Sequence, residues 1–216
     1  MGELERDTPT SRHIRPELLL GFGMVFPERS QVLRAYYQDI DDRRRRRAGE
    51  FEDELLDAAH RSPDELIEQI LADERPGELL ERAVQEALLA ADERKRWALA
   101  RAVASGLLGN DEAAIDEAQA IVRAIAALEP SHVRALLVLA RSANANGMRL
   151  GAGHVAAEIK ASPELAESLL AKLTADGLAR DATEFVPVMG PRGGSRWEIT
   201  ELGRRVLALL RSDPPS

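Results

Sequence analysis

The stretch that decides the fold is GHVAAEIKASPELAESLLAKLTADGL, residues 153–178. Apolar residues recur at spacings of three and four on both sides of Ser162 and Pro163, which predicts two helices. Ser162 suits the N-cap of the second helix, Pro163 its first turn and Gly177 its end. The stretch therefore predicts a short helix, a tight turn and a second helix whose core face is Ala166, Leu169, Leu170 and Leu173.

A hairpin and a final helix are predicted to follow. Residues 178–183, 185–188 and 195–199 have strand-like composition, and a Gly-rich turn at residues 190–194 separates the last two. Thr200 suits the N-cap of a helix whose apolar face is Leu202, Val206, Leu207 and Leu210. On the other side of the opening stretch, residues 131–145 have the apolar pattern of one further helix.

Together these elements resemble a bacterial MarR-like winged helix-turn-helix domain, an α+β domain that covers residues 131–212. The motifs that carry the resemblance are Val155-Ala-Ala-Glu-Ile159, Leu170-Ala-Lys-Leu173, Asp176-Gly-Leu178, the Gly-rich hairpin and Ile199-Thr-Glu-Leu-Gly203.

The resemblance implies a DNA-binding transcriptional regulator. The helix at residues 163–175 would enter the major groove of double-stranded DNA, and the hairpin at residues 185–199 would be the wing. The protein would be a homodimer, with the N-terminal helical body serving dimerisation or sensing. The residues expected at the DNA are Lys160, Ser162, Ser168, Lys172, Arg192 and Arg196.

The outward face of the second helix leaves an alternative open. Glu164 and Glu167 are unfavourable beside phosphates, and Leu165 suits a protein surface better than a groove. The alternative is a non-enzymatic adaptor whose winged helix docks a protein partner through Glu164, Leu165 and Glu167.

Residues 16–130 are predicted to form an antiparallel helical bundle, which makes the protein mainly α. Helices are expected at about residues 30–60, from Ser62 to about Asp73, at 78–90 after a break at Pro76-Gly77, from Asp92 to Gly109, and from Asn110 or Asp111 to Leu128. Ser62 and Glu65 would form a capping box at the start of the second helix. Residues 1–15 are expected to be a mobile tail.

Five consecutive arginines interrupt the apolar stripe of the first long helix, at Arg43, Arg44, Arg45, Arg46 and Arg47. One interpretation is a solvated turn whose arginines pair with Asp41, Asp42, Glu50 and Glu52. The other is a patch that binds phosphate or an acidic partner.

Composition and charge narrow the function classes. The chain has no cysteine and a net charge of −8, and its acidic residues are concentrated in the first 130 positions. Residues 131–216 carry 11 Lys and Arg against 9 Asp and Glu, so any polyanion is expected there. No apolar run is long enough to cross a bilayer, and we expect a cytoplasmic protein with no membrane contact.

No catalytic pattern is found, so we expect no enzyme, cofactor or metal. Two carboxylate–histidine pairs have helical spacing, Asp57 with His60 and Glu129 with His132, but each is expected at a helix end or junction. A ligand pocket between helices would draw on the few aromatic residues, although core packing is the expected use of each: Tyr36, Tyr37, Phe51 and Trp97.

Overall fold

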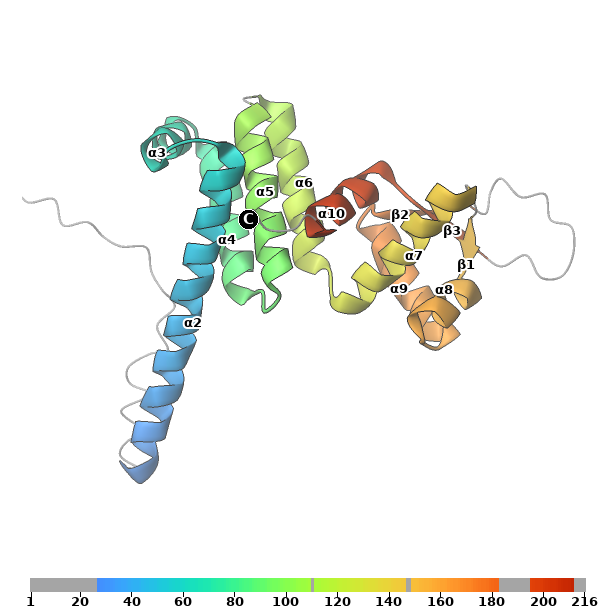
Figure 1. Ribbon diagram of the computed structural model, residues 1–216, viewed down its shortest axis with the longest axis horizontal. Helices are drawn as coiled ribbons and strands as arrows, with labels where there is room; N and C mark the ends of the chain where they lie inside the picture. Colours follow the sequence, from blue (N-terminus) through green and yellow to red (C-terminus); the bar gives the residue numbers. More distant parts are fainter. Residues whose placement is uncertain (1–26, 110, 147–148, 183–194, 212–216) are drawn as a thin grey trace, which may run out of the picture. The chain divides into compact units, whose positions relative to one another are not determined.

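The computed structural model describes residues 27–109, 111–146, 149–182 and 195–211, with side chains except at 27–34 and 144–146. The chain divides into two compact units, residues 1–46 and 47–216. The described part is mainly helical with a small three-stranded antiparallel sheet, which confirms the coarse fold class (Figure 1). The tail expected at residues 1–15, the strand expected at 185–188 and Arg192 lie outside the described residues.

In the first unit the structure describes part of α2 (Pro27–Ala59), the long helix expected from the sequence. Arg43 pairs with Asp39 at 2.6 Å and Arg45 with Asp42 at 3.0 Å. The predicted pairing is therefore right for Asp42, whereas Arg43 takes Asp39, which lies four residues before it on the same helix face. Both pairs are exposed, so each contributes only a few tenths of a kcal/mol, on the order of 0.3.

In the second unit, α3 (Pro63–Ala72) and α4 (Glu74–Leu89) are joined by Asp73 alone. The capping box of Ser62 with Glu65 is confirmed, and Asp73 caps α4 by accepting from the Arg75 N–H at 3.1 Å. The predicted break at Pro76-Gly77 is wrong. Pro76 lies in the first turn of α4, where a backbone N–H has no helical partner to lose.

Helix α5 (Glu93–Gly109) is the centre of the bundle. It packs against α4 and against α6 (Glu112–Ala127), as Figure 1 shows. Buried residues lie all around α5, which is the pattern of a helix enclosed on several sides. Small residues allow this close packing: a Cβ added at Gly106 would come within 2.6 Å of the Ala118 Cβ on α6.

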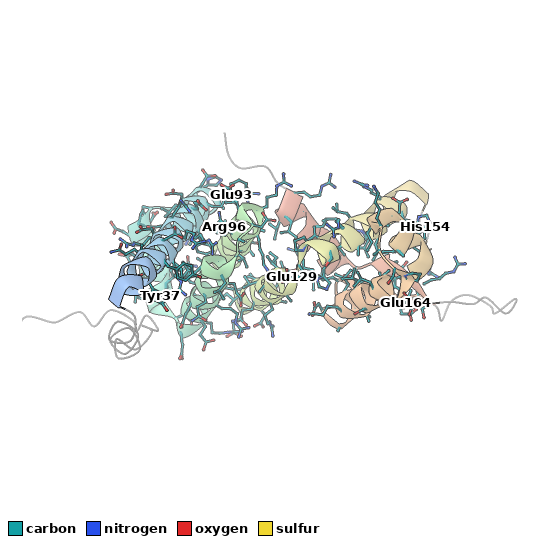
Figure 2. The ribbon with its side chains drawn as sticks, turned by 90° about the horizontal axis from the view of Figure 1, so that it is seen from below. Tyr37, Glu93, Arg96, Glu129, His154 and Glu164 are labelled. Atoms are coloured by element: carbon teal, nitrogen blue, oxygen red, sulfur yellow. The ribbon has the colours of Figure 1, made fainter. Side chains whose placement is uncertain are left out.

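Polar contacts as well as apolar ones attach residues 47–59 of α2 to the bundle. Phe51, Leu55 and Ala59 are buried. Beside them Glu50 pairs with Arg96, whose side chain is only 7% exposed, and Glu54 pairs with Arg101. The Arg96 guanidinium also donates to the carbonyls of Ala90 and Ala91, and Figure 2 shows Arg96 among the bundle helices. Glu50 therefore serves this contact and not the arginine run predicted from the sequence.

The rest of the second unit is the C-terminal module, which we define as the described residues of 130–211. Helix α7 (Pro130–Asn146) is followed by β1 (Leu150–Gly151), α8 (Ala152–Ile159), α9 (Pro163–Ala175), β2 (Ala179–Asp181), β3 (Arg196–Ile199) and α10 (Glu201–Arg211). The strand order is β1-β3-β2, and both pairings are antiparallel. Strand β1 was not predicted. Leu150 lies opposite Trp197 and Ala179 opposite Ile199.

Helix α10 connects the module to the bundle, because it packs against α5, α6 and α7. Val206 and Leu207 are buried, and Arg205 pairs with Glu117 of α6. Thr200 accepts from the Gly203 N–H at 3.0 Å, which confirms the predicted cap.

Gly203→Ala is expected to lower the free energy of unfolding by about 2 kcal/mol, the typical cost of overpacking. A Cβ at this position would lie 2.2 Å from the Leu178 carbonyl oxygen, so α10 would have to move. Gly153→Ala is the control, since its Cβ would meet nothing within 4 Å. Urea unfolding followed by circular dichroism measures both; equal stabilities would show that α10 adjusts without cost.

Arg96→Met is expected to cost about 3 kcal/mol, because it leaves Glu50 and two carbonyls without their buried donor. Arg45→Met breaks an exposed pair and is expected to cost less than about 0.5 kcal/mol. Thermal unfolding compares the two variants with the parent chain. A parent-like midpoint for Arg96→Met would mean that the contacts of Arg96 add nothing to the attachment of residues 47–59 of α2.

Candidate interaction surface on the C-terminal module

Helix α9 is held by one face and leaves the other exposed. Ala166, Leu169, Leu170 and Leu173 are buried against α7 and α8, which confirms the core face predicted from the sequence. The exposed face consists of Glu164, Leu165, Glu167, Ser168, Ala171 and Lys172.

The turn between α8 and α9 sets the start of this face. Lys160 ends α8 in the left-handed region, with φ 55°, which a non-glycine residue adopts only at some cost in free energy. The Ala161 N–H then donates to the Ala156 carbonyl at 2.9 Å. Ser162 caps α9 by accepting from the Leu165 N–H at 3.3 Å, and Pro163 occupies the first helical position, both as predicted.

The exposed face of α9 combines acidic and apolar character. Leu165 is 50% exposed, and Glu164 and Glu167 are exposed beside it. Hydrogen bonds from its own backbone N–H and from Ser162 lower the pKa of Glu164, so this carboxylate is ionised at neutral pH. Figure 2 shows Glu164 on the ribbon of α9.

The cation on this face is already paired. The Lys172 ammonium lies 2.6 Å from the Asp176 carboxylate, one turn further along the chain. Asp176 was not weighed as a partner in the sequence, although its i,i+4 spacing to Lys172 is the signal that could have found it.

Several other cations of the module are paired as well. Glu198 on β3 pairs with Arg180 and, at 3.5 Å, with Arg149. Burial raises the pKa of Glu198, but the hydrogen bond and charge of Arg180, together with Arg149, outweigh burial and hold the pKa below its usual value. Arg204 pairs with Glu201. Arg149, Lys172, Arg180, Arg204 and Arg205 of the module therefore each have a carboxylate partner within the protein.

The predicted DNA-contacting residues fall into two groups. Lys160, Ser162, Ser168 and Lys172 lie along the turn and the exposed side of α9, and all four are exposed. Arg196 is also exposed and begins β3. The arginine run lies elsewhere, in α2, where Arg47 donates to the Leu88 carbonyl at 2.8 Å.

No family model matches this chain, and no curated protein or solved structure is significantly similar to it.

The structure bears on two other site types considered from the sequence. The described residues contain no group of three or more His, Asp or Glu side chains placed to hold a metal ion. Over the same residues, no helix has the length and apolar character needed to cross a membrane.

His132 lies in the first turn of α7, and its pKa is affected by Lys172 and Asp176 at the end of α9. Its Nδ1 accepts a hydrogen bond from the backbone N–H of Glu129 at 3.1 Å, so the His132 side chain caps the start of α7. Burial lowers the pKa of His132, and Lys172 lowers it further; Asp176 and Glu129 act in the opposite sense without reversing the shift. A proton on Nδ1 would also remove the acceptor for the Glu129 N–H.

The free energy of unfolding is therefore expected to decrease as the pH is lowered through the range where His132 titrates. Because the folded pKa lies below the unfolded value of 6.5, protonation favours the unfolded chain as the pH drops below about 6.5. His132→Gln keeps a side-chain acceptor at this position and should flatten the fall in unfolding free energy between about pH 7 and pH 5. Urea titrations at several pH values measure this; coincident profiles would rule out His132 as the source.

Proposed function

We propose that the C-terminal module is a winged helix-turn-helix that docks a protein partner on the exposed face of α9, and that the chain is a non-enzymatic adaptor. The order of elements supports the first part. Helices α7, α8 and α9 pack on one another, β2 and β3 follow α9, and β1 completes the sheet beside β3. This order agrees with the resemblance seen in the sequence.

The observation that carries the docking proposal is the half-exposed Leu165 between Glu164 and Glu167. In a groove lined by phosphates, both carboxylates would be repelled and the leucine would gain little. A protein surface with an apolar pocket and Lys or Arg at its rim would bury the leucine and complement both charges. Because Lys172 is already paired with Asp176, its attraction for a DNA phosphate is weaker than its position on α9 suggests.

Duplex DNA is the second candidate, as expected for a transcriptional regulator. Two exposed cations favour it: Lys160, at the turn before α9, and Arg196, at the start of β3. Contacts from these positions would reach the phosphate backbone and position the module, while carrying little sequence information. The two candidates differ in what a charge change on α9 should do.

The docking proposal predicts a partner that contacts position 165. A photo-crosslinking residue placed there, in the full chain and in the cells that express it, is expected to give one defined adduct. Glu164→Lys with Glu167→Lys should weaken this interaction about tenfold or more, equivalent to about 1.4 kcal/mol. The control is the same crosslinker at Leu108, a partly exposed leucine of α5, which should not give this adduct.

The same variants test the DNA candidate. Under the docking proposal, selection from a random duplex library enriches no sequence, and Glu164→Lys with Glu167→Lys raises non-specific duplex affinity because the α9 face becomes basic. Two results together would overturn the docking proposal in favour of DNA. One is an enriched duplex sequence whose binding and salt dependence are lost in Arg192→Glu with Arg196→Glu, and the other is the absence of an adduct at position 165.

A further inference from the structure

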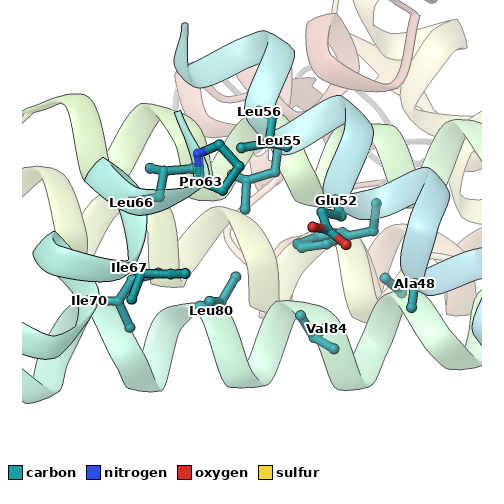
Figure 3. Close-up of a pocket in the computed structure, with 12 residues that line it drawn as sticks. Ala48, Glu52, Leu55, Leu56, Pro63, Leu66, Ile67, Ile70, Leu80 and Val84 are labelled. Carbon is teal, nitrogen blue, oxygen red and sulfur yellow. The ribbon is translucent and has the colours of Figure 1, made fainter. Parts of the chain in front are cut away.

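A second surface lies in the bundle, away from the C-terminal module. An open cavity of about 280 Å³ is bounded by α2, α3 and α4 (Figure 3). Phe51 is the one aromatic residue of the sequence-predicted set that lines it, and the half-buried Trp97 does not. Among its lining residues only Glu52 is charged. The aliphatic side chains that form most of its wall are Leu55, Leu66, Ile67, Ile70, Leu80 and Val84.

The apolar surface continues beyond the cavity along α3. Ile67 is 52% exposed and Leu71, one turn later on the same helix face, is 80% exposed. Leu66 is the buried apolar residue of α3, and Gln69 holds the helix by donating to the Leu107 carbonyl at 2.6 Å. An exposed apolar strip next to an apolar cavity is typical of an interaction site.

The exposed charged side chains of the cavity lining and of α3 beside the apolar strip are acidic. Two further carboxylates of α2, Glu50 and Glu54, are neutralised by Arg96 and Arg101. Glu52 is exposed where it lines the cavity, and Asp64 and Glu68 are exposed on α3 next to Ile67 and Leu71. Such a field attracts cationic partners and repels acidic ones.

We propose that this groove binds an amphipathic helix of a partner protein, with aliphatic residues on one face and Lys or Arg at its flanks. The aliphatic face would fill the cavity and cover Ile67 and Leu71, and the basic flanks would meet Glu52 and Glu68. A small apolar ligand would fill the cavity but would leave Leu71 exposed and the acidic rim unused. This surface is independent of the α9 face, so neither proposal depends on the other.

The test uses a labelled synthetic peptide about 18 residues long, with leucines at i, i+3, i+4 and i+7 and lysines at the flanks, titrated with the full chain by fluorescence anisotropy. Saturable binding is expected, and replacing the lysines by glutamates should weaken it about tenfold or more. Raising the salt concentration should also weaken it.

Ile67→Glu with Leu71→Glu should weaken binding of the lysine peptide about tenfold or more. Both residues are exposed, so the variant is expected to fold as the parent does, as circular dichroism would check. The added carboxylates would raise the electrostatic attraction, so a loss reports the apolar contact. Leu89→Glu with Leu108→Glu is the matched control, because it makes the same change at two exposed leucines outside the cavity lining.

Several results would overturn the proposal. They are absence of saturable binding, equal binding of the glutamate peptide, equal effects of the two double variants, and a dimer seen in sedimentation that Ile67→Glu with Leu71→Glu abolishes. The last would identify a second copy of this chain as the occupant of the groove. An aliphatic alcohol that displaces the lysine peptide would also overturn it, if Ile67→Glu with Leu71→Glu leaves the affinity of the peptide unchanged. That combination would indicate a site for a small apolar ligand.

Discussion

The second unit depends on the burial of α5 from several sides. Helices α4, α6 and α10 all pack against it, and α2 reaches it through the pairs of Glu50 with Arg96 and Glu54 with Arg101. Closeness is possible because alanines and Gly106 leave room for neighbouring backbones. Since α10 is the last helix of the C-terminal module, the same core that organises the bundle also anchors the module.

Local signals predicted most helix starts correctly. Ser62, Asp111, Ser162 and Thr200 all cap helices, because the cap depends on one side chain and the next three residues. The same local reasoning is wrong at Pro76, because a proline can lie in the first turn of a helix as well as at a break.

What the sequence could not predict depends on contacts between distant segments. Strand β1 is two residues long and exists through its pairing with β3, more than forty positions later. The groove likewise forms where α2, α3 and α4 meet, and the order of these helices along the chain does not tell which of their faces come together. For the α9 surface, the helical period predicts the outward residues correctly, and the spacing of four residues between Lys172 and Asp176 also indicates their pairing, whereas the exposure of Leu165 required the structure.

The charges of the two proposed surfaces are organised differently. On the C-terminal module, carboxylates such as Glu198 and Asp176 compensate nearby cations, so the field there is short in range. At the groove, the exposed carboxylates Glu52, Asp64 and Glu68 lie along the apolar surface, and their fields add. Encounter with a cationic partner at the groove would therefore be fast and sensitive to salt, whereas recognition at α9 would rest on shape and on the fit of Leu165.

The one-residue connection at Asp73 limits how far α3 and α4 can move apart at the groove. This single extended residue ends α3 and caps α4, so no flexible linker separates the two helices. Opening the groove by moving α3 away from α4 would require rotation at Asp73, loss of its cap to Arg75, or release of Gln69 from Leu107. A partner helix bound in the proposed groove would therefore meet a nearly fixed angle between α3 and α4, and its side chains would be selected by size on that side.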